Sequence, residues 1–193
     1  MGLAVLVLGL AVFIASHLMV TFRGARAAAI ARLGKPVYHT IFGLLALVGV
    51  ALIAWGYADY RATGWMQLWS PPPFMRHVTV GLMLIAAIVL MAWLVPSHIR
   101  AWTKFPLILA VKIWAFAHLL VNGDLGSMIM FGSLLAWSIY ARITAKRRTD
   151  VLLPAAPKTW FNDLVVVVGG VGLFLAVGFW FHPHVIGVPV FTR

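Results

Sequence analysis

VYHTIFGLLALVGVALIAWGY, residues 37–57, is a continuous apolar run that contains no Asp, Glu, Lys or Arg. A helix rises about 1.5 Å per residue, so a run of this length can cross the roughly 30 Å hydrocarbon core of a bilayer. Similar runs recur along the chain and predict six transmembrane helices, at about 2–22, 37–57, 77–95, 106–121, 125–143 and 161–181. The predicted fold class is therefore all-α, an integral membrane bundle of six transmembrane helices.

The composition supports this fold and limits the functions that the chain can have. Of its 193 residues 63% are hydrophobic and 10% are charged, whereas soluble domains have about 25% charged residues. No Pro/Gly/Ser-rich linker separates two apolar blocks, so we expect a single domain over residues 1–193. The absence of cysteine excludes disulfides, iron–sulfur clusters, thiolate ligands and covalent haem attachment.

The net charge of +11 reflects an excess of basic residues in the short loops beside the apolar runs. If the N-terminus is non-cytoplasmic, most basic residues lie on the inner side, as the positive-inside rule requires. This predicts that both termini are non-cytoplasmic and that the partner of the basic loops is membrane lipid, not nucleic acid. The inner residues are then Arg23, Arg26, Arg32, Lys35, Arg100, Lys104, Arg142, Lys146, Arg147, Arg148 and Lys158, and the outer ones are Arg61, Arg76 and Arg193.

Histidines inside the apolar runs are the strongest candidates for a site, because ionisable residues in a membrane are costly and mark function. His118 lies within the fourth run, one helical turn after Trp114. It either ligates a metal or haem iron, for which neutral imidazole is a common ligand, or donates to a carbonyl of a neighbouring helix. His17, near the inner end of the first run, has the same two alternatives. His77 begins the third run on the outer side.

The remaining polar residues near these runs have simpler interpretations beside functional ones. Lys112 either extends its amine towards the inner headgroups or pairs with a buried anion such as a haem propionate, and Arg76 could neutralise a propionate as well. Asp124 is typical of a helix N-cap. The other histidines are expected at the interfaces, His39 and His98 on the inner side and His182 and His184 on the outer side.

Enzyme motifs are missing from the sequence. It contains no H-E-x-x-H, no paired carboxylates, no phosphate-binding loop and no G-x-S-x-G. The glycines of VVVVGGVGLF, residues 165–174, lie inside an apolar run, where small residues let helices approach closely. Whether the protein is an enzyme stays open at this point.

Several segments in order along the chain resemble the NnrU family of six-helix membrane proteins, whose founding members are linked to nitrite and nitric oxide reduction. These segments are SHLMVTFR (16–23), RLGKPVYHTIFGLLALVG (32–49), LWSPPPFMRHVTVGLML (68–84) and TKFPLILAVKIWAFAHLLVNGDL (103–125). The resemblance implies a multi-pass protein of the bacterial inner membrane. It also implies a role in nitrite or nitric oxide metabolism or in related redox sensing.

The same family includes the zeta-carotene isomerase of plants and cyanobacteria, which carries haem b. By position its two proposed histidine ligands resemble His17 and His118, and its W-C-x-x-H motif matches at Trp114 and His118 with Ala115 in place of cysteine. The resemblance therefore implies haem b held by His118 and His17, with a hydrophobic small molecule or nitric oxide as partner. Haem-dependent cis–trans isomerisation of a carotenoid or other polyene is one alternative. A non-catalytic role in assembly of a respiratory reductase is another.

The depths of the two histidines along their helices keep a third candidate open. From the helical rise, His17 lies about 9 Å from the inner boundary at Arg23, and His118 about 18 Å from Pro106. Axial ligands of one iron are expected at similar depth. His77 is closer to His118 in depth and is therefore the alternative to His17.

Overall fold

The computed structural model describes residues 1–147 and 159–191, and most of these residues are helical. Within these two ranges there is no strand, and Gln67 and Asp124 form one isolated bridge. The predicted all-α fold is confirmed. The helices are α1 (Gly2–Leu18), α2 (Arg23–Leu33), α3 (Lys35–Ala62), α4 (Met75–Leu94), α5 (His98–Thr103), α6 (Pro106–Leu119), α7 (Leu125–Lys146), α8 (Trp160–Ala176) and the π-helix η1 (Val177–Ile186).

The lengths of these helices bear on how often the chain crosses a membrane. Four are long and apolar enough: α3, α4, α7 and the continuous helix Trp160–Ile186 formed by α8 and η1. Helices α1 and α2 add a fifth crossing if they count as one span, although they are bent by 86°. Helix α6 has 14 residues, about 21 Å of helix, which is shorter than the hydrocarbon core. The long apolar helices are those of a multi-pass membrane protein, while six crossings and the sides of the termini stay predictions.

Prolines precede the start of α4, and basic residues lie beside the apolar runs. Helix α4 begins at Met75, directly after the segment that holds Pro71, Pro72 and Pro73, because proline cannot continue a helix interior. Basic residues flank the apolar runs used for the topology prediction. Three of them, Arg148, Lys158 and Arg193, lie outside the described residues.

The chain forms two compact units that alternate along the sequence. The first unit comprises Met1–Pro71 and Asn122–Thr144, and the second comprises Pro72–Val121 and Ala145–Arg193. Each unit is described by itself below. The prediction of a single domain stays a prediction.

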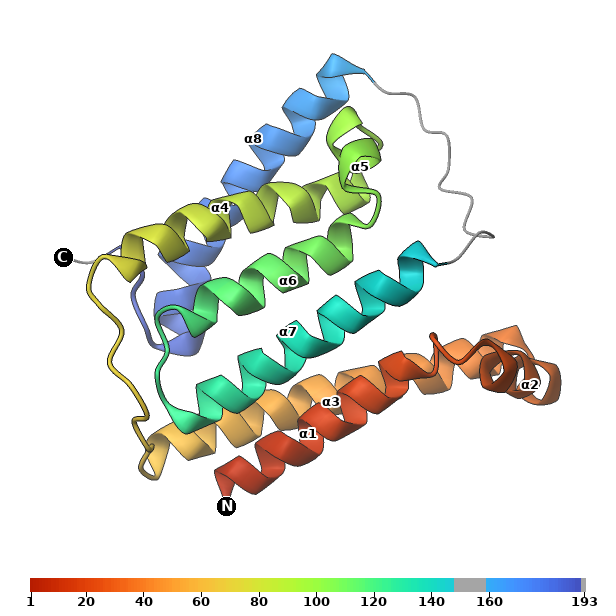
Figure 1. Ribbon diagram of the computed structural model, residues 1–193, viewed down its shortest axis with the longest axis horizontal. Helices are drawn as coiled ribbons and strands as arrows, with labels where there is room; N and C mark the ends of the chain where they lie inside the picture. The colour runs from red at the N-terminus through yellow and green to blue at the C-terminus, as the bar shows by residue number, and fades with distance from the viewer. Residues whose placement is uncertain (148–158, 192–193) are drawn as a thin grey trace. The chain divides into compact units, whose positions relative to one another are not determined.

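In the first unit, α1 and α3 lie side by side in opposite directions (Figure 1). Glycines bring their backbones into contact. A Cβ on Gly56 would lie 2.3 Å from the backbone nitrogen of Leu6, and one on Gly9 would lie 2.6 Å from that of Ile53. Since apolar burial cannot drive association within lipid, such close backbone packing is a principal source of helix–helix attraction there.

Helix α7 completes the first unit, and its start is fixed by Asp124. The Asp124 carboxylate is buried and accepts a hydrogen bond from the backbone N–H of Ser127 at 2.9 Å. This is the geometry of an N-cap, as the sequence predicted. The Ser127 hydroxyl in turn lies 2.7 Å from the Tyr57 hydroxyl of α3. Polar contacts therefore fix the end of the unit where α3 finishes and α7 begins.

In the second unit, α4 packs against both α6 and α8 (Figure 1). The buried hydroxyl of Thr79 near the start of α4 donates to the carbonyl oxygen of Ala117 near the end of α6, at 3.0 Å. A Cβ on Gly170 of α8 would lie 2.5 Å from the Cα of Ile88 on α4. The start of α8 lies near the end of α4, so α4 runs opposite to both of its neighbours.

Candidate functional site

His118 lies near the end of α6, and its own helix holds the imidazole in one tautomer. Its Nδ1–H donates to the carbonyl oxygen of Trp114 at 2.9 Å. A carbonyl oxygen can only accept, so in the neutral ring Nδ1 carries the proton and Nε2 the lone pair. Metal-binding histidines almost always donate their other ring N–H in this way. This orientation is compatible with ligation through Nε2, and the Trp114 indole lies beside the ring with centroids 5.2 Å apart.

His182 of η1 is the second histidine at this place in the second unit. Its ring centroid lies 6.3 Å from that of His118, and the two ring planes are inclined by only 25°. The Nδ1 atom of His182 is buried and has no hydrogen-bond partner in the part of the chain that the structure describes. Buried polar atoms are nearly always hydrogen-bonded, so this exception needs an explanation, and ligand binding is one.

The backbone around His182 departs from a regular α-helix. Residues Val177–Ile186 form a π-helix that contains Pro183, a residue without an N–H to donate. Gly187 ends it in the left-handed region with φ 74°, and the Val188 N–H returns to the carbonyl oxygen of His182 at 3.1 Å. Single π turns inside helices occur frequently at functional sites.

Three further residues that the sequence predicted for the site, Arg76, His77 and Lys112, also belong to this unit. The guanidinium of Arg76 donates to the carbonyl oxygen of Val190, which fastens the C-terminal segment to the start of α4. His77 is exposed at the same helix start. Lys112 is half-buried on α6 and makes no ion pair within the described ranges. The pairing of Arg76 or Lys112 with a propionate stays a prediction.

His17 belongs to the first unit and repeats the arrangement of His118. Its Nδ1 lies 2.8 Å from the carbonyl oxygen of Phe13, one turn earlier on α1, so this nitrogen again carries the proton. Aromatic rings surround the imidazole, with centroids at 4.1 Å for Phe13 and at 5.2 Å for both Phe42 and Trp137. Three helices therefore enclose His17 in an aromatic cage.

The structure thus places the two foremost candidate ligands in different units. His118 meets Trp114 and His182 within the second unit, whereas His17 meets only aromatic side chains and Ser16 among the described residues of the first. The pairing of His118 with His17, or with His77, stays a prediction. The contact with His182 was missed by the sequence analysis, which placed that residue at a solvated helix end.

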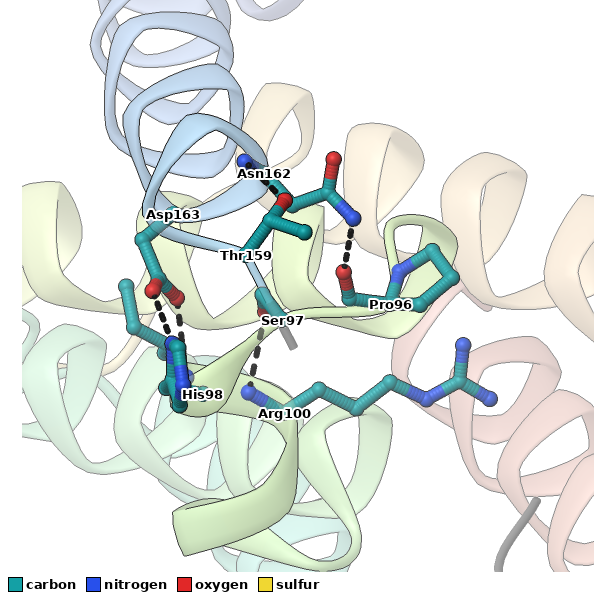
Figure 2. A network of polar contacts seen from close by, with 8 residues as sticks. Pro96, Ser97, His98, Arg100, Thr159, Asn162 and Asp163 are labelled. Atoms are coloured by element: carbon teal, nitrogen blue, oxygen red, sulfur yellow. Dashed lines mark hydrogen bonds and ion pairs between the residues drawn. The ribbon is translucent and has the colours of Figure 1, made fainter. Parts of the chain in front are cut away.

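A second polar cluster, also missed, lies where α4, α5 and α8 meet (Figure 2). The Nδ1–H of His98 donates to the carboxylate of Asp163 at 2.6 Å, and the backbone N–H of Ile99 donates to the other oxygen at 3.2 Å. The Asn162 amide donates to the carbonyl oxygen of Pro96 at 2.7 Å. This cluster joins the start of α8 to the turn before α5. Within it Asp163, an acidic residue in an apolar segment, is paired with His98.

The donor set decides which kind of metal centre these residues fit. The described residues contain no group of three or more His, Cys, Asp or Glu side chains placed to hold one metal ion. A structural zinc site needs about four protein ligands, and the described residues do not bring that many together. Haem carries its own equatorial nitrogens and needs only one or two axial side chains, for which histidine is usual. The oriented His118 and the unsatisfied nitrogen of His182 fit that requirement.

Comparison with known proteins gives one match. A family model described as NnrU protein matches residues 5–190, nearly the whole chain. No curated protein and no solved structure matches the chain.

Proposed function

The chain belongs to the NnrU family, and from this membership we propose that it binds haem b through His118. We propose further that it acts in nitrite and nitric oxide metabolism or in related redox sensing. The observation that carries the proposal is the hydrogen bond from His118 Nδ1 to the Trp114 carbonyl oxygen, at 2.9 Å. It leaves the lone pair on Nε2, the form of imidazole that ligates iron.

Side chains around His118 would orient the haem and exclude water from it. Trp114 lies beside the His118 ring, and the buried Thr79 hydroxyl fixes the carbonyl of Ala117, the residue before His118. Haem bound here would supply an iron that binds nitric oxide or exchanges an electron, with a potential set by its protein ligands and the polarity around them. Arg76 and Lys112 are the cations proposed to neutralise the propionates.

His17 is the second ligand that the family resemblance implies, and its hydrogen bond to Phe13 supports that role. His77 is the alternative. Each is tested by the same spectrum, because replacing an axial ligand changes the absorbance of bound haem. We expect His17→Ala or His77→Ala to alter the spectrum only if that residue contacts the iron.

For topology we propose six crossings of the bacterial inner membrane with both termini non-cytoplasmic. Within the first unit α1 and α3 run in opposite directions, and within the second unit α4 runs opposite to α6 and α8. These directions are the ones that alternating crossings require. Cysteine labelling from each side of the membrane at Arg61→Cys and Arg147→Cys would test it, since the wild type has no cysteine.

The decisive experiment is an absorbance spectrum of the full-length protein purified after haem-supplemented expression. We expect a Soret band, its loss in His118→Ala, and little change in His39→Ala, an exposed histidine on α3. Addition of nitric oxide to the reduced protein should shift the band. A wild-type protein without a Soret band would contradict haem binding and favour the accessory role. Conversion of an added cis-polyene would instead favour isomerisation.

A further inference from the structure

We propose that His182, in place of His17 or His77, is the residue that completes the ligand pair with His118. This inference rests on the proposed haem binding and assigns the second protein ligand of that site. Both residues belong to the second unit, so the pairing depends only on contacts within it.

The spacing of the two rings suits one metal between them. Metal–imidazole bonds are about 2.0–2.1 Å long, so two imidazoles on opposite sides of one ion have centroids roughly 6 Å apart. The observed separation is 6.3 Å with the ring planes 25° apart.

The hydrogen bonds of the two rings differ in a way that fits this pairing. His118 donates through Nδ1 to its own helix, which fixes the ring. His182 has a buried Nδ1 with no hydrogen-bond partner. Leaving a polar atom buried without a partner is costly, and a coordinate bond from Nδ1 of His182 to a metal would remove that cost.

Two hydrogen bonds of the C-terminal segment hold the backbone at His182 in place. Its carbonyl oxygen accepts from the Val188 N–H, which returns the chain after Gly187. Two residues later, the Val190 carbonyl oxygen accepts from Arg76 of α4. The C-terminal segment therefore ties η1 to α4, the helix that also holds the end of α6 through Thr79.

His184 is a matched control on the same π-helix. It is exposed, its Nδ1 donates to the carbonyl oxygen of Trp180 at 2.7 Å, and its ring lies against the Trp180 ring and not against His118. It shares with His182 the residue type, the helix and the neighbour Pro183. The two residues differ in exposure, in the hydrogen bonding of Nδ1 and in the contact with His118.

The test compares wild type, His182→Ala and His184→Ala as purified full-length proteins, with absorbance and electron paramagnetic resonance spectra of the oxidised form. We expect a low-spin bis-histidine signal in wild type and in His184→Ala. In His182→Ala we expect bound haem with a high-spin signal, or a several-fold lower haem content. Free imidazole added to His182→Ala should restore the low-spin signal, which a merely misfolded protein would not do.

The outcomes separate the inference from its premise. Absence of haem from wild type overturns both the proposed function and this pairing. Haem in wild type with the same low-spin signal in His182→Ala overturns the pairing alone and leaves the proposed function intact. A loss of the signal in His184→Ala as large as that in His182→Ala also overturns the pairing, because only one of the two residues contacts His118.

Discussion

Gly49 of α3 lies directly against Phe13 of α1: a Cβ on Gly49 would come within 2.8 Å of the Phe13 Cβ and 2.9 Å of its backbone nitrogen. The same Phe13 accepts the hydrogen bond of His17 and stacks its ring 4.1 Å from the imidazole. The packing of two glycine-containing helices thereby sets the position of a candidate ligand.

Replacing Gly49 by alanine should disturb both the packing of α1 against α3 and the position of His17. The new methyl group must displace backbone atoms of α1, and overpacking of this kind costs about 1–3 kcal/mol. We expect a lower melting temperature in detergent and faster modification of His17 by diethyl pyrocarbonate, measured by mass spectrometry. Gly43→Ala on the same helix is the control, because nothing lies within 4 Å of a Cβ there. Equal effects of both variants would contradict the role of the contact.

The hydroxyl of Thr79 should influence His118 through the backbone of α6. It donates to the carbonyl oxygen of Ala117 at 3.0 Å from a buried position. Thr79→Val keeps the shape and removes this interhelical bond, at a cost of about 0.6 kcal/mol for bonds of this type in membranes. We expect a small loss of stability and a shift in the haem spectrum, with Thr79→Ser close to wild type. A shift in both variants would point to packing and not to the hydrogen bond.

The cap at Asp124 should stabilise α7 by itself. Asp124→Ala removes the acceptor of the Ser127 N–H, and loss of an N-cap costs about 0.5–2 kcal/mol. Asp124→Asn keeps an acceptor oxygen and should retain most of the stability. Unfolding followed by helical circular dichroism in increasing dodecyl sulfate measures the difference. If alanine and asparagine destabilise equally, the side-chain charge matters more than the cap.

The pair His98–Asp163 should be coupled energetically. Each single variant, His98→Ala or Asp163→Ala, removes the hydrogen bond of 2.6 Å, so the double variant should lose less stability than the sum of the two single losses. Thermal unfolding of the four proteins measures this coupling. Asp59→Asn is a suitable control, since the Asp59 carboxylate is partly exposed and forms a long ion pair, at 4.0 Å, with the chain's terminal amine. Additive losses would indicate that the two residues act independently.

These residues also show what the sequence could predict. Apolar runs located the helices because hydrophobic length is a property of contiguous residues. The Asp124 cap was predicted for the same reason, since capping joins residues three apart. The partners of His98 and His118, by contrast, lie 65 and 64 residues away, at Asp163 and His182. Tertiary packing creates these two pairs, and the spacing of residues along the sequence does not predict them. The π-helix Val177–Ile186 was not predicted either, and it extends beyond the run 161–181 that the sequence indicated.

Arg76 offers a test of how the C-terminal segment supports His182. Its guanidinium donates to the carbonyl oxygen of Val190, in the segment that also returns from Val188 to His182. We expect Arg76→Gln to speed proteolysis of this segment and to change the haem spectrum in the same direction as His182→Ala, but less. Ending the chain after Gly187 removes the acceptor, so Arg76→Gln should add almost nothing to that truncation. If Arg76 acts instead on a haem propionate, its effect on the spectrum will persist in the truncated protein, and the two changes will add.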